Sequence, residues 1–256
     1  MSTALRIEWL ETSALGALRV TDAVTGRGIA APVIVSAPGL SLLRKGLTDY
    51  VIMAADDVGA GLDVPVEARP LGGTYLARRI TLHLPRDSNP ANAAQPTSIF
   101  QPAVIPLLPA PSYPANGNMA LLRVTVRRST DGARVGGAVV RLRTAPLPAP
   151  DVHSMSDAAG EALIVVPDVP LTSPGPGATV VGDIPAQLDV LVDPGLASFT
   201  ADADIDAARR IAQARTTGFI DPDDIIARLG PVAPAAVTVR VASGRVAFAT
   251  TTWVPA

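Results

Sequence analysis

The chain of 256 residues has no cysteine and few charged residues. The absence of cysteine excludes disulfides, thiol nucleophiles and cysteine-ligated metals, and it fits a protein made in a reducing cytoplasm. Charged residues make up 17% of the chain, against about 25% in an average soluble domain. Much of the surface must then be neutral, and a neutral surface is expected to be buried in part against something else.

Long apolar runs and an excess of positive charge are also missing. Pro, Arg or Asp interrupts every apolar stretch well before the ~18 residues that a membrane helix needs, so no membrane span is expected. The net charge of −2 gives no broad attraction to nucleic acid. The first residues carry no basic segment followed by an apolar one, so no secretory signal is expected and the predicted location is cytoplasmic.

Candidate catalytic residues are scarce. His83 and His153 are the only side chains suited to general base catalysis near neutral pH. His153 is followed by Ser154 in a segment flanked by proline, and no Gly-x-Ser-x-Gly motif is present to position a nucleophile. We therefore expect solvated histidines and no enzyme. A hydrolase that uses two strand carboxylates stays open as a third alternative.

One acidic run imitates a calcium loop. Asp202, Asp204 and Asp206 have the spacing of its first three ligands, but Ala207 and Gln213 stand where glycine and glutamate are required. An Asp-rich helix start explains the run without a metal. The glycine-rich turns match neither a P-loop nor a dinucleotide-binding motif. The sequence predicts no metal and no cofactor.

Short β-rich runs separated by Gly, Pro, Asn and Asp dominate residues 1–200. Ile80, Leu82 and Leu84 alternate with polar residues, which is the period of a strand with one buried face. Turn signals at intervals of about 8–12 residues are typical of a sandwich or barrel. The sequence therefore predicts a mainly β fold.

A proline-rich segment divides the chain. We predict an N-terminal β-sandwich domain over 1–86, an extended arm over 87–117 and a second sandwich domain over 118–256. A disordered linker would be polar, but the arm is rich in large apolar residues. The predicted protein-interaction residues are Ile99, Phe100, Val104, Ile105, Leu107 and Leu108. The arm can lie on a partner protein, including a second copy, or fold back over its own domain.

The last part of the chain contains helix signals followed by strand signals. A helix is expected at about 201–217, where acids come early and arginines late. A second helix over 222–229 begins after Asp221 as N-cap, has Pro222 in its first turn and ends at Gly230.

A C-terminal β-hairpin is predicted over 236–252, with its turn at Ser243-Gly244. Its apolar residues are expected on one shared face: Val237, Val239, Val241, Val246, Phe248 and Thr250.

Two parts of the chain share a pattern of strand, glycine turn and strand. Residues 17–35 begin with Ala-Leu-Arg-Val-Thr, and residues 121–142 begin with Leu-Leu-Arg-Val-Thr. The pattern suggests two copies of one β-module. Residues 119–170, with Asp-Gly-Ala-Arg-Val-Gly-Gly-Ala-Val-Val-Arg-Leu and Ser-Asp-Ala-Ala-Gly-Glu-Ala-Leu, resemble the carboxypeptidase regulatory-like, transthyretin-like β-sandwich module. The resemblance implies a transthyretin-like sandwich over these residues. Together with the repeat, the arm and the helix and hairpin signals, the predicted fold is two Ig-like or transthyretin-like sandwiches joined by the arm, with a helical insertion before the hairpin.

The layout of the whole chain resembles small accessory proteins encoded with phage-tail-like contractile injection systems. The residues concerned are the opening Leu-Arg-Val-Thr-Asp-Ala-Val-Thr-Gly-Arg, Leu-Pro-Arg-Asp at 84–87, Phe-Gln-Pro at 100–102 and Tyr-Pro at 113–114. The resemblance implies a non-enzymatic structural or adaptor component with protein partners, carried in a particle that is later released. The alternative is a free-standing module that binds carbohydrate or protein.

Overall fold

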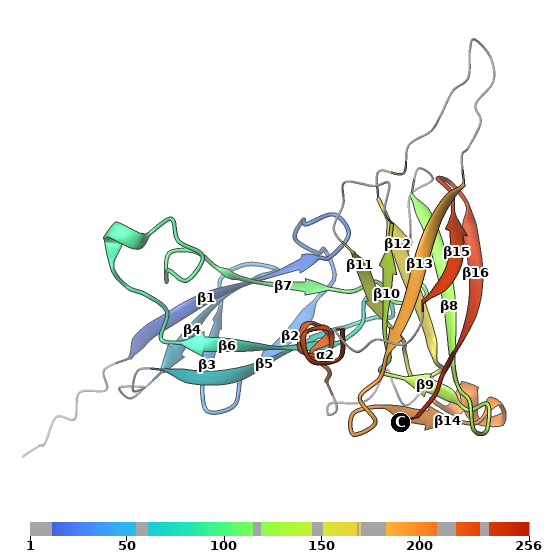
Figure 1. The fold of residues 1–256 in the computed structure, drawn as a ribbon. Coiled ribbons are helices and arrows are strands. Elements are labelled where there is room, and N and C mark those ends of the chain that lie inside the picture. Colours follow the sequence, from blue (N-terminus) through green and yellow to red (C-terminus); the bar gives the residue numbers. More distant parts are fainter. Residues whose placement is uncertain are drawn as a thin grey trace, which may run out of the picture.

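The protein is described here by a computed structural model that covers residues 12–54, 61–114, 119–144, 151–167, 169, 183–208, 219–230 and 236–255. The fold is mainly β, as the sequence predicts. The strands form two pairs of sheets, each pair packed around its own apolar core (Figure 1). We call these pairs the first and the second sandwich.

The first sandwich contains seven strands: β1 (Ser13–Asp22), β2 (Val33–Ser36), β3 (Ser41–Arg44), β4 (Asp49–Ala54), β5 (Leu62–Pro70), β6 (Arg78–Leu84) and β7 (Ala103–Leu107). One sheet has the order β3-β4-β1-β7 and the other β2-β5-β6. Leu82 and Leu84 of β6 are buried in the core between the sheets, and Ile80 packs against it. The alternation predicted for this strand is confirmed.

The second sandwich contains the remaining strands: β8 (Ala120–Arg128), β9 (Arg134–Gly136), β10 (Val139–Arg143), β11 (Val152–Met155), β12 (Glu161–Val166), β13 (Ile184–Leu191), β14 (Ser198–Thr200), β15 (Val237–Val241) and β16 (Val246–Trp253). One sheet has the order β11-β10-β13-β15, and the other has β12-β8-β9-β14 with β16 paired to β8. Leu122, Val124 and Val126 of β8 lie in the core because alternate side chains of a strand share one face.

The two sandwiches share an order of strand pairing. In the first, β1 pairs with β4 antiparallel and with β7 parallel, while β5 joins β2 to β6. In the second, β8 pairs with β12 antiparallel and with β16 parallel, while β13 joins β10 to β15. The sandwiches differ at other strands: β3 pairs with β4 whereas β11 pairs with β10, and the second sandwich also contains β9 and β14, which follow β8 in its sheet. The short sequence repeat thus corresponds to equivalent strands, β1 and β8.

Two glycine turns support the second sandwich. Gly137 has a φ of 81°, and a side chain there would collide with Ile220. Gly160, with a φ of 69°, closes the tight turn that begins at Asp157, and its N–H donates to the Asp157 carbonyl at 2.9 Å. Both positions require glycine because L side chains rarely adopt a positive φ.

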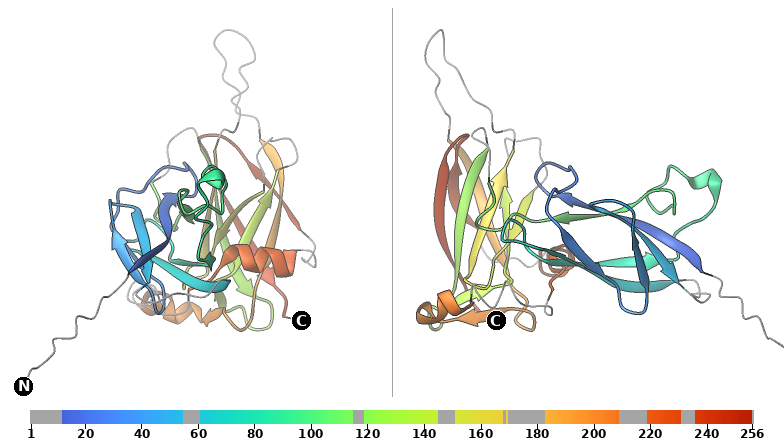
Figure 2. Two further views of the ribbon diagram at one scale, coloured as in Figure 1. Left: turned by 90° about the vertical axis from the view of Figure 1, so that its left-hand side faces the viewer. Right: turned by 180° about the vertical axis from the view of Figure 1, so that it is seen from behind.

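Helix α2 (Pro222–Leu229) lies where the two sandwiches meet (Figures 1 and 2). Its predicted bounds and N-cap are confirmed, since the Asp221 side chain accepts hydrogen bonds from the N–H groups of Asp223 and Asp224. Ile220 and Ile225 pack there with residues of both sandwiches, Leu108 and Leu191 among them. The other short helices are η1 (Pro90–Asn92) and η2 (Asp202–Asp204). Of the helix predicted at 201–217, residues 205–208 are helical and 209–217 lie outside the described residues.

The segment predicted as an arm contributes a strand to the first sandwich. Residues 103–107 form β7, which pairs in parallel with β1. They are thus not a free connector. The placement is possible because β7 is an edge strand, where a proline such as Pro106 costs no ladder hydrogen bond when its nitrogen points outward.

The predicted C-terminal hairpin is wrong. β15 pairs with β13 and β16 pairs with β8, so the two strands belong to different sheets. The shared apolar face is wrong as well, because Val241 is buried whereas Val246 and Phe248 are exposed. The Ser243-Gly244 turn crosses from one sheet of the sandwich to the other.

Candidate protein-interaction surfaces

The predicted interaction residues fall into two groups. Ile105, Leu107 and Leu108 are buried within the chain, the first two in the first core and the third beside α2. Phe100 is 56% exposed and Val104 is also exposed. The structure therefore leaves only Phe100 and Val104 well placed to contact a partner; Ile99 is partly buried.

Phe100 belongs to an ordered loop between β6 and β7, which we call the excursion (residues 87–102). It projects from the end of the first sandwich that lies away from the second (Figure 1). Asp87 organises it by accepting hydrogen bonds from the Asn89 N–H at 2.8 Å and from Asn92 Nδ2 at 2.6 Å. These bonds lower the pKa of Asp87. Arg86 adds bonds from its guanidinium to the carbonyls of Ser98 and Pro96.

A buried carboxylate fixes the other end of the predicted arm. Asp22, at the end of β1, accepts hydrogen bonds from the hydroxyls of Tyr75 at 3.0 Å and Tyr113 at 2.7 Å. Burial and the carboxylate raise the pKa of Tyr75 to about 12 and raise that of Tyr113 further. The two rings also meet edge to face, with centroids 5.6 Å apart. The chain is therefore held against the first sandwich on both sides of β7.

An ionic cluster joins the sandwiches through α2. Arg78 of β6 is only 1% exposed, and it donates to the Pro106 carbonyl at 2.8 Å and to Asp223 Oδ2 at 2.7 Å. His153 Nε2 of β11 lies 3.5 Å from the other oxygen of Asp223. Burial lowers the pKa of His153, and the carboxylate of Asp223 partly opposes this effect. One carboxylate of α2 thus contacts a side chain from each sandwich.

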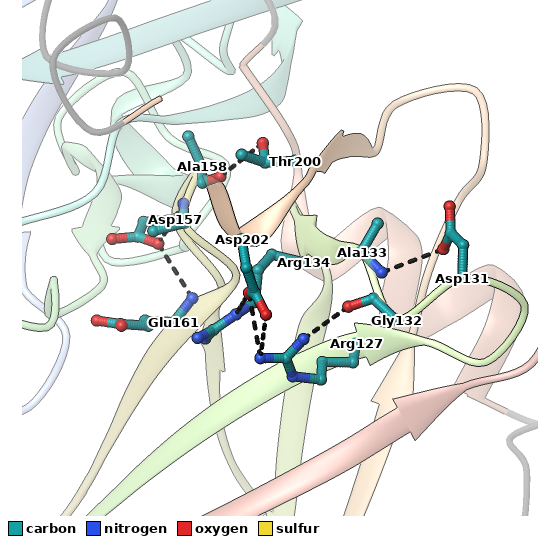
Figure 3. A network of polar contacts seen from close by, with 11 residues as sticks. Arg127, Asp131, Gly132, Ala133, Arg134, Asp157, Ala158, Glu161, Thr200 and Asp202 are labelled. Atoms are coloured by element: carbon teal, nitrogen blue, oxygen red, sulfur yellow. Dashed lines mark hydrogen bonds and ion pairs between the residues drawn. The ribbon is translucent and has the colours of Figure 1, made fainter. Parts of the chain in front are cut away.

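The acidic run that imitates a calcium loop is used differently. Asp202 accepts hydrogen bonds from Arg127 at 3.0 Å and from Arg134 at 2.9 Å (Figure 3). These bonds lower the pKa of Asp202. Close by, Thr200 donates to the Ala158 carbonyl at 3.1 Å. The network ties β8, β9 and β14 together, and no group of three potential metal ligands occurs in the described ranges.

Each histidine has a carboxylate neighbour. His83 Nδ1 lies 2.9 Å from Asp63 Oδ1 with both side chains exposed, and His153 faces Asp223. Within the part of the chain that the structure describes, neither histidine forms a hydrogen bond with a serine or threonine hydroxyl. These pairs lack the nucleophile of a catalytic triad.

Among the described residues, the most exposed large apolar side chain is Phe248 of β16, at 78%. Val246 on the same strand and Val254 just after it are also exposed. The sequence prediction missed this surface because it placed Val246 and Phe248 on one face with Val241, which is buried. The signal available was the alternation itself, since Ala247, Ala249 and Thr251 fit the inward face equally well.

An aromatic pair lies close to this strand. Phe199 of β14 stacks on Trp253, with ring centroids 5.9 Å apart. The Arg128 guanidinium lies 4.1 Å from the Phe199 centroid, in cation–π contact. The Phe199 ring is thus engaged by side chains of the same chain, which disfavours its use as a stacking platform for a sugar.

No helix among the described residues is long and apolar enough to cross a membrane. Comparison of the chain with protein-family models, curated proteins and solved structures finds no match.

Proposed function

We propose that the protein is a non-enzymatic structural or adaptor component of a phage-tail-like contractile particle, acting through protein–protein contacts. The observation that carries the proposal is the placement of the two most exposed phenylalanines. Phe100 lies in the excursion at one end of the joined sandwiches, and Phe248 lies on β16 at the other end (Figure 1). Exposed apolar side chains at separate ends suit a component that bridges two neighbours.

The chemistry of the described residues supports the same proposal. Both histidines face carboxylates, and Asp202 is held by two arginines. Arg78 of the first sandwich and Asp223 of α2 form an ion pair at 2.7 Å, at the junction of the two sandwiches. Asp202, Arg78 and Asp223 thus have a structural use for their charges, in contacts between strands or between the sandwiches.

Co-sedimentation in lysate of the native host tests the proposal. The tagged wild-type chain is expected in the fast-sedimenting fraction together with sheathed tubes. The double variant Phe100→Asp, Val104→Asp should reduce that share by at least about tenfold, because a charge at a buried contact costs more than the ~1.4 kcal/mol that tenfold represents.

Leu71→Asp is the matched control. Leu71 is comparably exposed and follows β5 of the same sandwich, outside the excursion. It should leave sedimentation unchanged. A wild-type chain found only in the slow fraction, or equal losses in both variants, would contradict the proposal.

A further inference from the structure

β16 is the outermost strand on its side of the sheet. It pairs with β8 along Val246–Trp253, and the other side of β8 is occupied by β12. The carbonyls of Arg245 and Trp253 accept hydrogen bonds from the N–H groups of Leu121 and Ser129. The polar groups of odd-numbered residues in β16 therefore point toward β8.

Because successive residues in a strand direct their N–H and C=O groups to opposite sides, the even-numbered residues of β16 point theirs toward the open edge. These residues are Val246, Phe248, Thr250 and Thr252. No strand within the described ranges pairs with this edge. A row of unpaired donors and acceptors is a template for another extended chain.

This edge lacks the protection found at several other edges of the described sheets. Edge strands avoid unwanted pairing through proline, charge or shortness. β7 contains Pro106, β15 contains Arg240, and β3 is short and ends at Arg44. β16 has eight residues, Val-Ala-Phe-Ala-Thr-Thr-Thr-Trp, with neither proline nor charge. The edge is thus open to pairing along its whole length.

We infer that β16 pairs antiparallel with β16 of a second copy of this chain, with Thr250 of each copy opposite the other. The segment is self-complementary in this register. Val246 faces Val254, Phe248 faces Thr252 and Ala247 faces Trp253 across the twofold axis, so apolar or neutral residues meet throughout and small residues meet large ones.

This register also gives hydrogen-bond partners to the backbone N–H and C=O groups at the open edge of β16. Thr250 and its neighbours two residues away have their polar groups on the open side, so opposing residues exchange both hydrogen bonds at once. The pairing would join two five-stranded sheets into one. It would also gather the exposed Val246, Phe248 and Val254 of both copies into one apolar surface. The inference rests on the proposed function, because it names one of the contacts through which such a component assembles.

Single cysteines test the register, since the chain has none of its own. In a hydrogen-bonded antiparallel pair the two Thr250 Cα atoms are about 5.5 Å apart, within the range of about 4.4–6.8 Å that a disulfide spans. Mild oxidation of Thr250→Cys should therefore give a covalent dimer on a non-reducing gel. In Thr252→Cys the two Cα atoms would be roughly 14 Å apart along the strands, too far for a disulfide. This matched variant should therefore give no covalent dimer on the gel. Equal cross-linking of both variants, or none of Thr250→Cys, would overturn the inference.

A pair of proline variants tests the role of the edge by sedimentation velocity and circular dichroism. Thr250→Pro removes an N–H that only the second copy would use, so it should give a folded monomer where the wild type is a dimer. Thr251→Pro removes an N–H directed at β8 and should unfold the second sandwich. Should Thr250→Pro disturb the fold, Phe248→Lys places a charge on the same edge and is expected to give the monomer. A folded variant that stays dimeric would overturn the inference.

The two proposals fail separately. A monomeric wild-type chain that still sediments with host particles would contradict the β16 pairing but support the proposed function. A dimer that never sediments with particles would support the β16 pairing but contradict the proposed function.

Discussion

The three tyrosines of the protein all donate hydrogen bonds within the first sandwich and its flanks. Tyr50 donates to the Val33 carbonyl at 2.9 Å, and Tyr75 and Tyr113 share Asp22. Ionisation of any of them would remove a donor and place an anion against an acceptor in a poorly hydrated site. The pKa of each tyrosine is accordingly raised above 10.0.

Absorbance titration of the phenolates checks this arrangement. The native protein should show little phenolate absorbance at pH 10.5, whereas the chain unfolded in guanidinium should be more than half ionised there, since the ordinary tyrosine pKa is 10.0. A folded-state pKa above the unfolded value means that the unfolded chain loses protons first. These tyrosines thus contribute stability that is present below pH 10 and is lost as the pH rises toward 12. Native titration near pH 10 would contradict the described contacts.

At the scale of an element, α2 is the part that belongs to both sandwiches. Ile225 is completely buried among residues of each, while Ile226 on the same helix is only partly buried. Arg78 and His153 approach Asp223 from the two sides. The helix therefore stabilises the junction through its apolar face and through one carboxylate.

Urea unfolding of two alanine variants tests this role. Ile225→Ala should lower the free energy of unfolding by about 3 kcal/mol, because it leaves a cavity where no solvent reaches. Ile226→Ala makes the same chemical change at a partly exposed site and should cost about 1 kcal/mol or less. Equal costs would show that α2 does not pack into the junction as described.

Some elements of the fold could be predicted from the sequence alone, and others could not. β6 and α2 could be predicted because their signals are local: alternation in one, and an N-cap with proline and aspartates in the other. The hairpin prediction failed because β15 and β16 find their partners, β13 and β8, far away in the chain. A local turn at Ser243-Gly244 cannot reveal that choice.

The candidate interaction surface was predictable only in part. Phe100 and Val104 were expected to be available, and they are exposed. Ile105 and Leu107 were assigned to the same arm because the segment is rich in proline. They instead belong to β7, an edge strand of the first sandwich. The Leu107 carbonyl accepts from the Ala23 N–H at 3.0 Å, so the nitrogen of Pro106 points away from β1 and no ladder bond is lost. Phe248 was missed because its orientation follows from the pairing of β16.

At the scale of the whole molecule, two sandwiches with separate cores are held together by α2 and its ionic cluster (Figure 2). The excursion projects at one end and β16 lies at the other (Figure 1). This layout keeps two apolar surfaces apart and presents each on a different sandwich. This arrangement suits the proposed component, which would contact two neighbours.

The most direct test of this account is gold labelling of a tagged wild-type chain on particles purified from the native host, viewed by negative-stain electron microscopy. We predict label at one fixed position along sheathed tubes, and its loss in the Phe100→Asp, Val104→Asp variant but not in Leu71→Asp. Unlabelled tubes, with all of the tagged chain in the free protein fraction, would contradict the central claim that this protein is a structural component of such a particle.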